Sequence, residues 1–182
     1  VYCTYVSKNS NKSNKITWIK TKKLSSNKFK SIKFDILLDL AWYDLNDFSS
    51  KTHNQIQVFE HLNLYKSLVK VNPYISIYTV GTCLEYGSRS GRLKESYKSK
   101  PVTNYAIAKD NLRKKTQILK KGSNFNFTWM RIFYIYGQNE ARKTIYSQFI
   151  DSVKKNKKTF DMSRGTQIRD YLPVEKLAQF IF

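Results

Sequence analysis

The chain of 182 residues lacks the features that mark several common protein classes. Its two cysteines, Cys3 and Cys83, are too few for a disulfide framework and favour a reducing compartment, most simply the cytoplasm. Its two histidines, His53 and His61, fit polar positions on or just before one helix, and no residue cluster has metal-site spacing. Charges interrupt every apolar run before the roughly 18 residues needed to span a membrane, and no secretory signal is recognisable. These absences predict a globular protein without a structural metal or a membrane span.

Acidic residues are also scarce, because 13 of them stand against 33 lysines and arginines, which gives a formal net charge of +20. A basic surface of this kind can bind nucleic acid through its phosphates. Lysines outnumber arginines 26 to 7, however, although arginine suits forked phosphate and base contacts better. No nucleic-acid-binding motif is present either. We therefore interpret the charge as a compositional bias, and a basic nucleic-acid-binding module remains a minor alternative.

Apolar periodicity predicts alternating strands and helices. Strands are expected at 1–6, 16–19, 34–42, 74–80 and 125–134, and helices at 54–71, 103–121 and 174–182. The run 34–42 is almost continuously apolar, which is typical of a parallel strand buried on both faces. Helix 54–71 carries its apolar residues at 56, 59, 62, 65, 68 and 69. Thr103 is expected to cap the next helix and Gly122 to stop it, so the pattern indicates parallel βαβ units.

Tyr105 and Lys109 form the most informative pair in the sequence. Residues four apart on a helix share one face, so the lysine ammonium can lie near the phenol. A nearby positive charge favours the phenolate, which lets a tyrosine exchange protons well below its ordinary pKa of about 10. With a hydroxyl such as that of Thr82 at the same point, the three side chains could reduce a carbonyl or oxidise an alcohol. An exposed helical pair is the alternative, because tyrosine and lysine are both abundant here.

Five segments, in order along the chain, resemble the extended short-chain dehydrogenase/reductase family, in its branch that modifies nucleotide-diphosphate sugars. The segments are Phe34–Trp42, Ile77–Gly87, Pro101–Arg113, Arg131–Gly137 and Arg169–Glu175. The resemblance implies an α/β fold, a doubly wound, Rossmann-like parallel sheet, with NAD or NADP as cofactor. Residues 1–137 would form part of the cofactor-binding domain and 138–182 part of a smaller substrate-binding region.

The glycine-rich turn that holds a dinucleotide pyrophosphate is not found in this sequence. None of the six glycines, at 81, 87, 91, 122, 137 and 165, forms that turn, so the first strand and its loop would precede Val1. We therefore expect a fragment of a longer reductase, or else a shortened, catalytically silent relative that acts as a binding protein. The lysines of the stretch 19–24 argue against a contact between this stretch and the adenine of the cofactor. Lys8 and Lys12 could favour the 2′-phosphate of NADP.

The resemblance also implies roles for single residues. Tyr105 would be the general acid/base, Lys109 would support it and bind the nicotinamide ribose, and Thr82 would hold the substrate oxygen. The remaining site residues implied are Leu40, Ala41 and Trp42 beside the cofactor, and Tyr134 and Arg169, with Thr82, on the sugar nucleotide.

Two substitutions narrow the predicted reaction. Dehydratases of this family carry Asp-Glu after the hydroxyl residue, where this chain has Cys83 and Leu84, so a 4-ketoreductase or epimerase fits better. Glu85 comes one place later, where strand alternation predicts that it faces the other way. The resemblance further implies a homodimer packed through the helices at 54–71 and 103–121.

Overall fold

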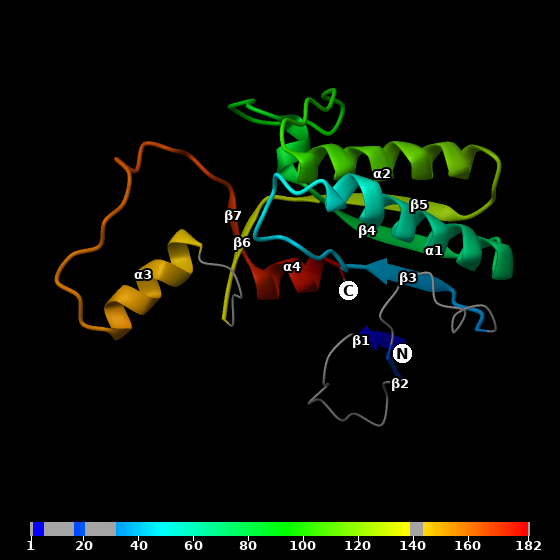
Figure 1. The fold of residues 1–182 in the computed structure, drawn as a ribbon, viewed down its shortest axis with the longest axis horizontal. Helices are drawn as coiled ribbons and strands as arrows, with labels where there is room; N and C mark the ends of the chain where they lie inside the picture. Colours follow the sequence, from blue (N-terminus) through cyan, green and yellow to red (C-terminus); the bar gives the residue numbers. More distant parts are fainter. Residues whose placement is uncertain (1, 6–16, 21–31, 139–143, 182) are drawn as a thin grey trace. The chain divides into compact units, whose positions relative to one another are not determined.

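The computed structural model describes residues 2–5, 17–20, 32–138 and 144–181. Two compact units divide the chain, Val1–Met130 and Arg131–Phe182. Figure 1 traces their elements along the sequence. In the described ranges, no helix combines the length and the apolar character that crossing a bilayer requires.

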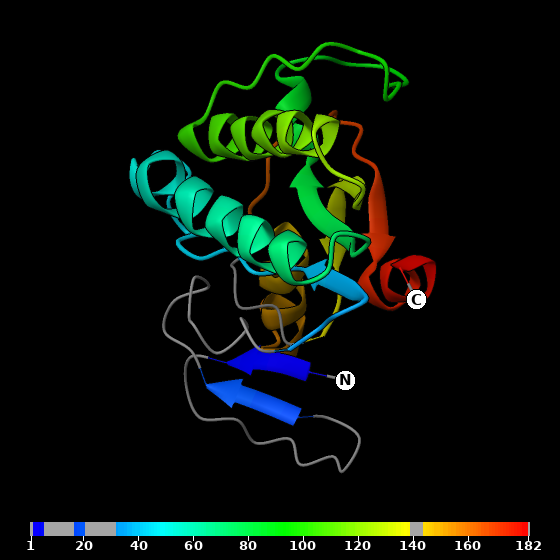
Figure 2. The same ribbon diagram turned by 90° about the vertical axis from the view of Figure 1, so that its right-hand side faces the viewer.

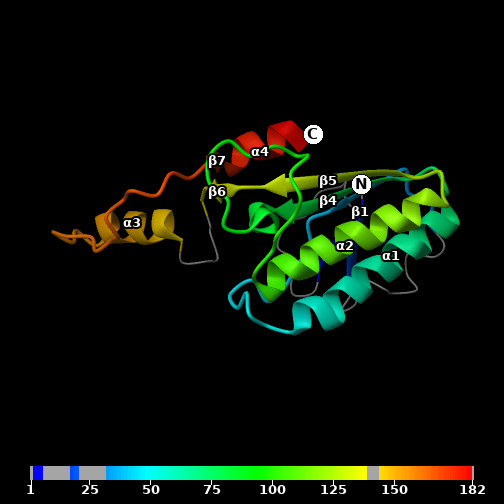
Figure 3. The same cartoon turned by 90° about the horizontal axis from the view of Figure 1, so that it is seen from above.

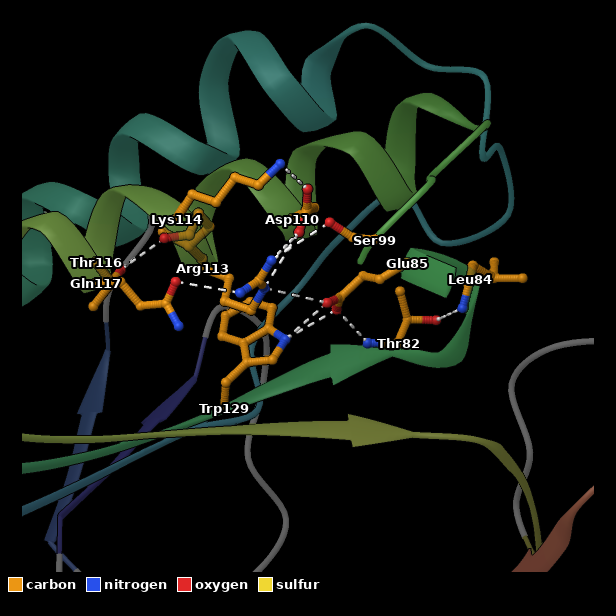
Figure 4. Close-up of polar contacts among 11 residues, drawn as sticks. Thr82, Leu84, Glu85, Ser99, Asp110, Arg113, Lys114, Thr116, Gln117 and Trp129 are labelled. Carbon is orange, nitrogen blue, oxygen red and sulfur yellow. Dashed lines mark hydrogen bonds and ion pairs between the residues drawn. The ribbon is translucent and has the colours of Figure 1, made fainter. Parts of the chain in front are cut away.

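A parallel sheet forms the centre of the first unit. Its three strands, in spatial order, are β3 (Ile36–Asp39), β4 (Ser76–Thr82) and β5 (Asn126–Ile132). β3 and β4 pair in parallel, with Asp39 opposite Thr79, and Figure 4 shows β4 and β5 running in the same direction. The carboxyl ends of the strands therefore meet at one edge, which is where ligands bind in sheets of this kind.

Two helices cover one face of this sheet, as Figures 2 and 3 show. They are α1 (Val58–Val71), which a π-helical turn at His53–Gln57 precedes, and α2 (Asn104–Lys121). The core lies between these helices and the strands, and its buried apolar side chains are Val58, Leu64, Tyr65, Leu68, Ile75, Ile77, Ala108, Leu112 and Phe125. The α/β, Rossmann-like architecture predicted from the sequence is confirmed.

Local signals in the sequence explain the ends of both helices. Thr103 caps α2, because its side-chain oxygen accepts the N–H of Ala106 at 3.2 Å. Gly122 ends α2 as predicted, but its φ of −106° shows that it does so without a left-handed conformation. α1 ends at Asn72, whose extended backbone is the conformation that the following Pro73 favours.

The predicted burial was wrong at two places. Ile36 in β3 is 64% exposed, because the two helices cover only one face of the described sheet and β3 lies at its edge. In the helical segment, Ile56 and Phe59 are 45% and 65% exposed, and the buried stripe runs through Val58 and His61 instead. A π-helical turn has more residues per turn than an α-helix, so Ile56 falls out of phase with the positions that follow.

The second unit contains a two-stranded parallel sheet and two helices. Its elements are β6 (Tyr134–Tyr136), α3 (Ile145–Lys154), β7 (Tyr171–Pro173) and α4 (Val174–Ile181), with β6 paired to β7. The single strand predicted at 125–134 is thus divided, because its last residue begins β6. Helix α4 agrees with the prediction, whereas α3, capped by Thr144 through the N–H of Ser147, was not foreseen.

Two short strands near the N-terminus pair in parallel as well. They are β1 (Tyr2–Tyr5) and β2 (Thr17–Lys20), with Tyr2 opposite Thr17. Both strands were predicted. Lys8, Lys12 and most of the lysine-rich stretch 19–24 lie outside the described residues.

Candidate active site

Thr82 is the last residue of β4 and is almost fully buried, at 7% exposure. It caps a short 3-10 helix, Cys83–Tyr86, through its hydroxyl oxygen, which accepts the N–H of Leu84 at 3.3 Å. The hydroxyl hydrogen takes no part in this bond and stays available for another acceptor. Thr82 therefore offers a donor at the carboxyl edge of the sheet.

Glu85 completes the cap from the other side. Its carboxylate accepts the backbone N–H of Thr82 at 2.9 Å, which makes the two residues a capping box. The same carboxylate accepts the indole N–H of Trp129 on β5, at 3.0 Å and 3.1 Å from its two oxygens (Figure 4). Strand alternation does not apply at Glu85, because the chain turns into a 3-10 helix after Thr82; the buried carboxylate takes its direction from its bonds to Thr82 and Trp129.

An arginine on α2 extends this network. Arg113 lies with its Nε 3.7 Å from Glu85 and donates to Asp110 at 2.5 Å, and Lys114 also contacts Asp110 at 2.6 Å (Figure 4). Burial alone would raise the pKa of Asp110, but hydrogen bonds from Lys114, Arg113 and Ser99 hold it below its usual value. The buried carboxylate of Glu85 thus links the end of β4 to β5 and to the middle of α2.

Gly81 is required by this arrangement. A Cβ atom at Gly81 would lie 2.2 Å from the indole nitrogen of Trp129 and 2.5 Å from a carboxylate oxygen of Glu85. Real side-chain carbons do not approach so closely, so the network can form only where residue 81 has no side chain.

Tyr105 lies in the first turn of α2 and is buried against aromatic rings. Its ring stacks on Phe48 at a centroid distance of 4.8 Å and meets the edge of Trp42 at 6.2 Å. Its backbone N–H donates to the carbonyl of Phe48 at 3.0 Å. These contacts fix the start of the helix against the loop that follows β3.

Lys109 is one turn further along α2 and is only 3% exposed. Its ammonium donates to the carbonyl of Val80 at 2.9 Å and lies 3.8 Å from the ring centroid of Trp42, a cation–π contact. Burial lowers the pKa of Lys109 to about 8, although the charges of Asp39 and Glu85 act in the opposite direction. The ammonium therefore titrates close to neutral pH.

Three residues predicted from the sequence thus meet at one place. Tyr105 and Lys109 both contact Trp42, and Lys109 is bonded to β4 two residues before Thr82. Leu40 and Ala41 follow β3 and are exposed, and the N–H of Ala41 donates to Asp39 at 3.2 Å.

Sequence reasoning missed a buried polar cluster behind Trp42. His61 donates through Nδ1 to the carboxylate of Asp39 at 2.6 Å, and the hydroxyl of Tyr65 donates to the same oxygen. The hydroxyl oxygens of Tyr65 and Thr79 are 2.9 Å apart, within hydrogen-bonding distance. The histidines had been interpreted as ordinary polar positions, but His53 and His61 are 0% and 1% exposed. An acid at the end of an apolar strand was the signal that a buried partner was needed.

Tyr134 and Arg169 lie together in the second unit. The guanidinium of Arg169 donates to the Tyr134 hydroxyl at 2.6 Å, covers its ring at 4.9 Å, and donates to Gln167 at 2.8 Å. Arg169 is exposed, and these contacts hold its guanidinium in place at the surface of the unit. Among the residues that the structure describes, no three side chains of metal-ligand type gather into a group.

A match to a protein-family model identifies the family of this chain. The model of the NAD dependent epimerase/dehydratase family matches residues 6–182. A dTDP-6-deoxy-L-talose 4-dehydrogenase (NAD(+)) of Aggregatibacter actinomycetemcomitans is 23% identical over 145 residues, which cover 79% of this chain and 53% of that protein.

Two solved structures share the fold. A UDP-N-acetylglucosamine 4-epimerase from Methanobrevibacter ruminantium, in complex with UDP-N-acetylmuramic acid, superposes with a TM-score of 0.77 at 20% identity, covering 91% of this chain and 56% of that one. A UDP-glucuronic acid 4-epimerase from Bacillus cereus, in complex with UDP-glucuronic acid and NAD, gives 0.74 at 18% identity, with 91% and 54% covered. The chain thus spans about half the length of these relatives.

Proposed function

This chain belongs to the NAD dependent epimerase/dehydratase family. From that premise we propose that the protein is a cytoplasmic NAD(P)-dependent reductase or epimerase that acts on nucleotide-diphosphate sugars at C4. The observation that carries the proposal is the meeting of Tyr105 and Lys109 on the ring of Trp42, beside the strand that ends at Thr82. The relatives named above act at the 4-position of nucleotide-linked sugars, which supports the choice of carbon.

The proposed roles follow from the hydrogen-bonding capacity of each side chain. Thr82 donates its hydroxyl hydrogen to the sugar oxygen, because its own oxygen already accepts the N–H of Leu84. Tyr105 passes a proton to or from that oxygen as the carbon is reduced or oxidised. Lys109 supplies the positive charge that favours this transfer, and Trp42 fixes the position of its ammonium.

The residues near Lys109 fit the nicotinamide end of a dinucleotide. An ammonium carries three hydrogens, and the carbonyl of Val80 takes one of them, so donors remain for ribose hydroxyls. The exposed segment at Leu40 and Ala41 lies at the same strand edge, next to Trp42. When bound, NAD or NADP would supply the hydride chemistry that these side chains cannot perform.

Elimination of water is disfavoured as the reaction. Cys83 and Leu84 stand where a dehydratase needs an acid and a base, and neither can do that work. Glu85 does not replace them, because it is fully buried and its carboxylate is bonded to Thr82 and Trp129. The remaining set of Thr82, Tyr105 and Lys109 suffices for ketone reduction or epimerisation.

Ligand protection of the purified chain tests the proposal. A UDP-, CDP- or dTDP-linked sugar should raise its melting temperature, in proportion to the logarithm of ligand concentration above Kd. A basic nucleic-acid-binding module would instead bind DNA or RNA with a steep salt dependence and ignore the sugar nucleotides. Protection by sugar nucleotide without any response to NAD or NADP, in the protein encoded by the complete reading frame, would favour the silent binding relative.

Replacing Tyr105 by Phe in the protein encoded by the complete reading frame tests the chemistry. Turnover should fall by about 10²- to 10⁴-fold, the usual contribution of a general acid/base, while the Kd for the sugar nucleotide stays the same. Tyr97→Phe, at a partly exposed tyrosine outside the site, is the matched control. Full turnover in Tyr105→Phe would refute the assignment.

A further inference from the structure

Asp39 is a buried carboxylate with several donors directed at it. It is 5% exposed at the end of β3 and accepts from Ala41 N–H, His61 Nδ1 and the Tyr65 hydroxyl. Burial alone would raise the pKa of Asp39, but the hydrogen bond and charge of His61, with the Tyr65 hydrogen bond and the charge of Lys109, hold it below its usual value. Asp39 is therefore a fixed negative charge inside the protein.

His61 connects this charge to Trp42. The imidazole stacks on the Trp42 ring with centroids 4.9 Å apart and planes 22° apart, and its Nδ1 is 2.6 Å from Asp39. The indole N–H of Trp42 donates to Nδ1 of His53 at 3.2 Å, while Nε2 of His53 faces the carbonyl of Asp47 at 2.9 Å. Two histidines thus hold the orientation of one tryptophan ring.

The ring held in this way is the one that carries the Lys109 ammonium. Nζ of Lys109 lies 3.8 Å from the Trp42 centroid, and the same ring forms a T-shaped pair with Tyr105. A cation is attracted to the face of an indole only when the ring is correctly turned, so the position of the ammonium depends on what holds the ring.

We propose that Asp39 is a positioning residue for Lys109: it holds His61 against Trp42, and the Trp42 ring in turn seats the ammonium. The inference rests on the proposed role of Lys109 and deepens it. Neither Asp39 nor His61 was assigned any function by the sequence, and neither is expected to touch substrate or cofactor.

The carboxylate also acts on Lys109 through its charge. Among the described residues, two carboxylates act on the ammonium through their charge, Asp39 from β3 and Glu85 from the 3-10 helix. The titratable groups that contact its neighbours Trp42 and Asp39 are His61 and Tyr65 from α1, His53 from the π-helical turn, and Tyr105 from α2. Of the two carboxylates, Asp39 acts more strongly than Glu85 against the burial that lowers the pKa of Lys109. Removing the charge of Asp39 should therefore favour the neutral amine more than removing that of Glu85.

The test is a proton–carbon NMR titration of the purified chain labelled with ¹³C at lysine Cε. The Cε shift reports protonation of each ammonium, and the Hε shift reports the ring current of Trp42. One cross-peak therefore measures both the charge of Lys109 and its position over the ring. Comparison with Lys109→Met identifies the peak, Trp42→Leu gives its position without the ring, and exposed Lys66 is the internal control.

In Asp39→Asn we expect the titration midpoint of Lys109 to fall by about one pH unit and its ring-current shift to shrink. Glu85→Gln should lower the midpoint less and leave the ring-current shift in place. A folded Asp39→Asn chain with both values unchanged, or a larger midpoint change in Glu85→Gln, would overturn the proposal.

His61→Gln decides the matter if Asp39→Asn does not fold. This variant keeps the carboxylate but removes the stacked ring, so the ring-current shift of Lys109 should collapse. Retention of the wild-type shift would exclude the positioning role. The titration needs neither cofactor nor substrate, so a chain that binds no sugar nucleotide would refute the proposed function without deciding the role of Asp39.

Discussion

Lys109 holds its ammonium 3.8 Å from the ring centroid of Trp42 while it is almost fully buried. A tryptophan face and one carbonyl replace the water that normally surrounds a lysine, which is why burial lowers the pKa of Lys109 to about 8. The lysine is thus held at an energetic cost that depends on pH.

The first prediction concerns stability against pH. Between pH 8 and 10.5 the unfolded chain keeps the Lys109 proton and the native chain releases it, so the unfolded state binds more protons and stability rises with pH. The full effect amounts to about 3 kcal/mol. The difference in unfolding free energy between wild type and Lys109→Met, from urea titrations at pH 7 to 10, should change by most of this amount in favour of wild type.

Lys66→Met, at an exposed position of α1, is the control and should show no such trend. Parallel pH profiles for wild type and Lys109→Met would mean that the ammonium is not desolvated.

A second prediction concerns the space above Gly81. Gly81→Ala should destabilise the chain by about 1–3 kcal/mol, because the new Cβ overlaps Trp129 and Glu85. Gly122→Ala, where a Cβ meets nothing within 4 Å, should be neutral. In a double-mutant cycle with Trp129→Phe, the loss of unfolding free energy in the double variant should differ from the sum of the two single losses by about 1 kcal/mol, because both substitutions act on the same contact. Strictly additive values in urea unfolding would contradict the close approach.

A third prediction concerns Arg169, which the family resemblance implies on the sugar nucleotide and which we propose contacts its diphosphate. Arg169→Lys should weaken binding of a UDP-linked sugar about tenfold, because lysine keeps the charge but loses the planar fork that matches a diphosphate. Tyr134→Phe should weaken it less, through the loss of one hydrogen bond that orients the guanidinium. Calorimetric Kd values would measure both, with the exposed Arg164→Lys as control. An unchanged Kd for Arg169→Lys would remove this residue from the site.

A fourth prediction concerns assembly, for which the resemblance implies a homodimer through the two helices. Ile56 and Phe59 at the start of the α1 segment and Ile118 on α2 are exposed, which is the composition that a helix-mediated interface uses. Phe59→Lys should shift the mass from dimer to monomer in light scattering after gel filtration. Tyr74→Lys, equally exposed but outside both helices, should not. A wild-type chain that is monomeric at all concentrations would exclude this dimer.

The sequence predicted most elements because their signals are local. Thr103 is a strong cap with helical periodicity after it, and β4 follows Pro73 as a run rich in β-branched and aromatic residues. The pair Tyr105 and Lys109 could be found because its spacing is fixed by the helix itself.

The parts that were missed depend on contacts between distant segments. Asp39 and His61 are 22 residues apart, and neither local sequence shows that these two residues will form a hydrogen bond. That bond offsets the cost of burying the Asp39 carboxylate. Strand alternation could not place Glu85, because a 3-10 turn replaces the strand after Thr82, and the carboxylate in that turn bonds Trp129 from 44 residues away. Burial of a polar group depends on the partner that it finds in three dimensions.

The carboxylate of Glu85 has a consequence for how the first unit comes apart. It bonds the end of β4 and the indole on β5, and lies near the arginine on α2, so withdrawing any one of these elements leaves a charge in the interior without its partners. Local opening of a single strand or of the helix therefore requires a high free energy. The amide hydrogens of β4, β5 and the middle of α2 should exchange with solvent together, as one cooperative block, while the chain outside this block opens independently.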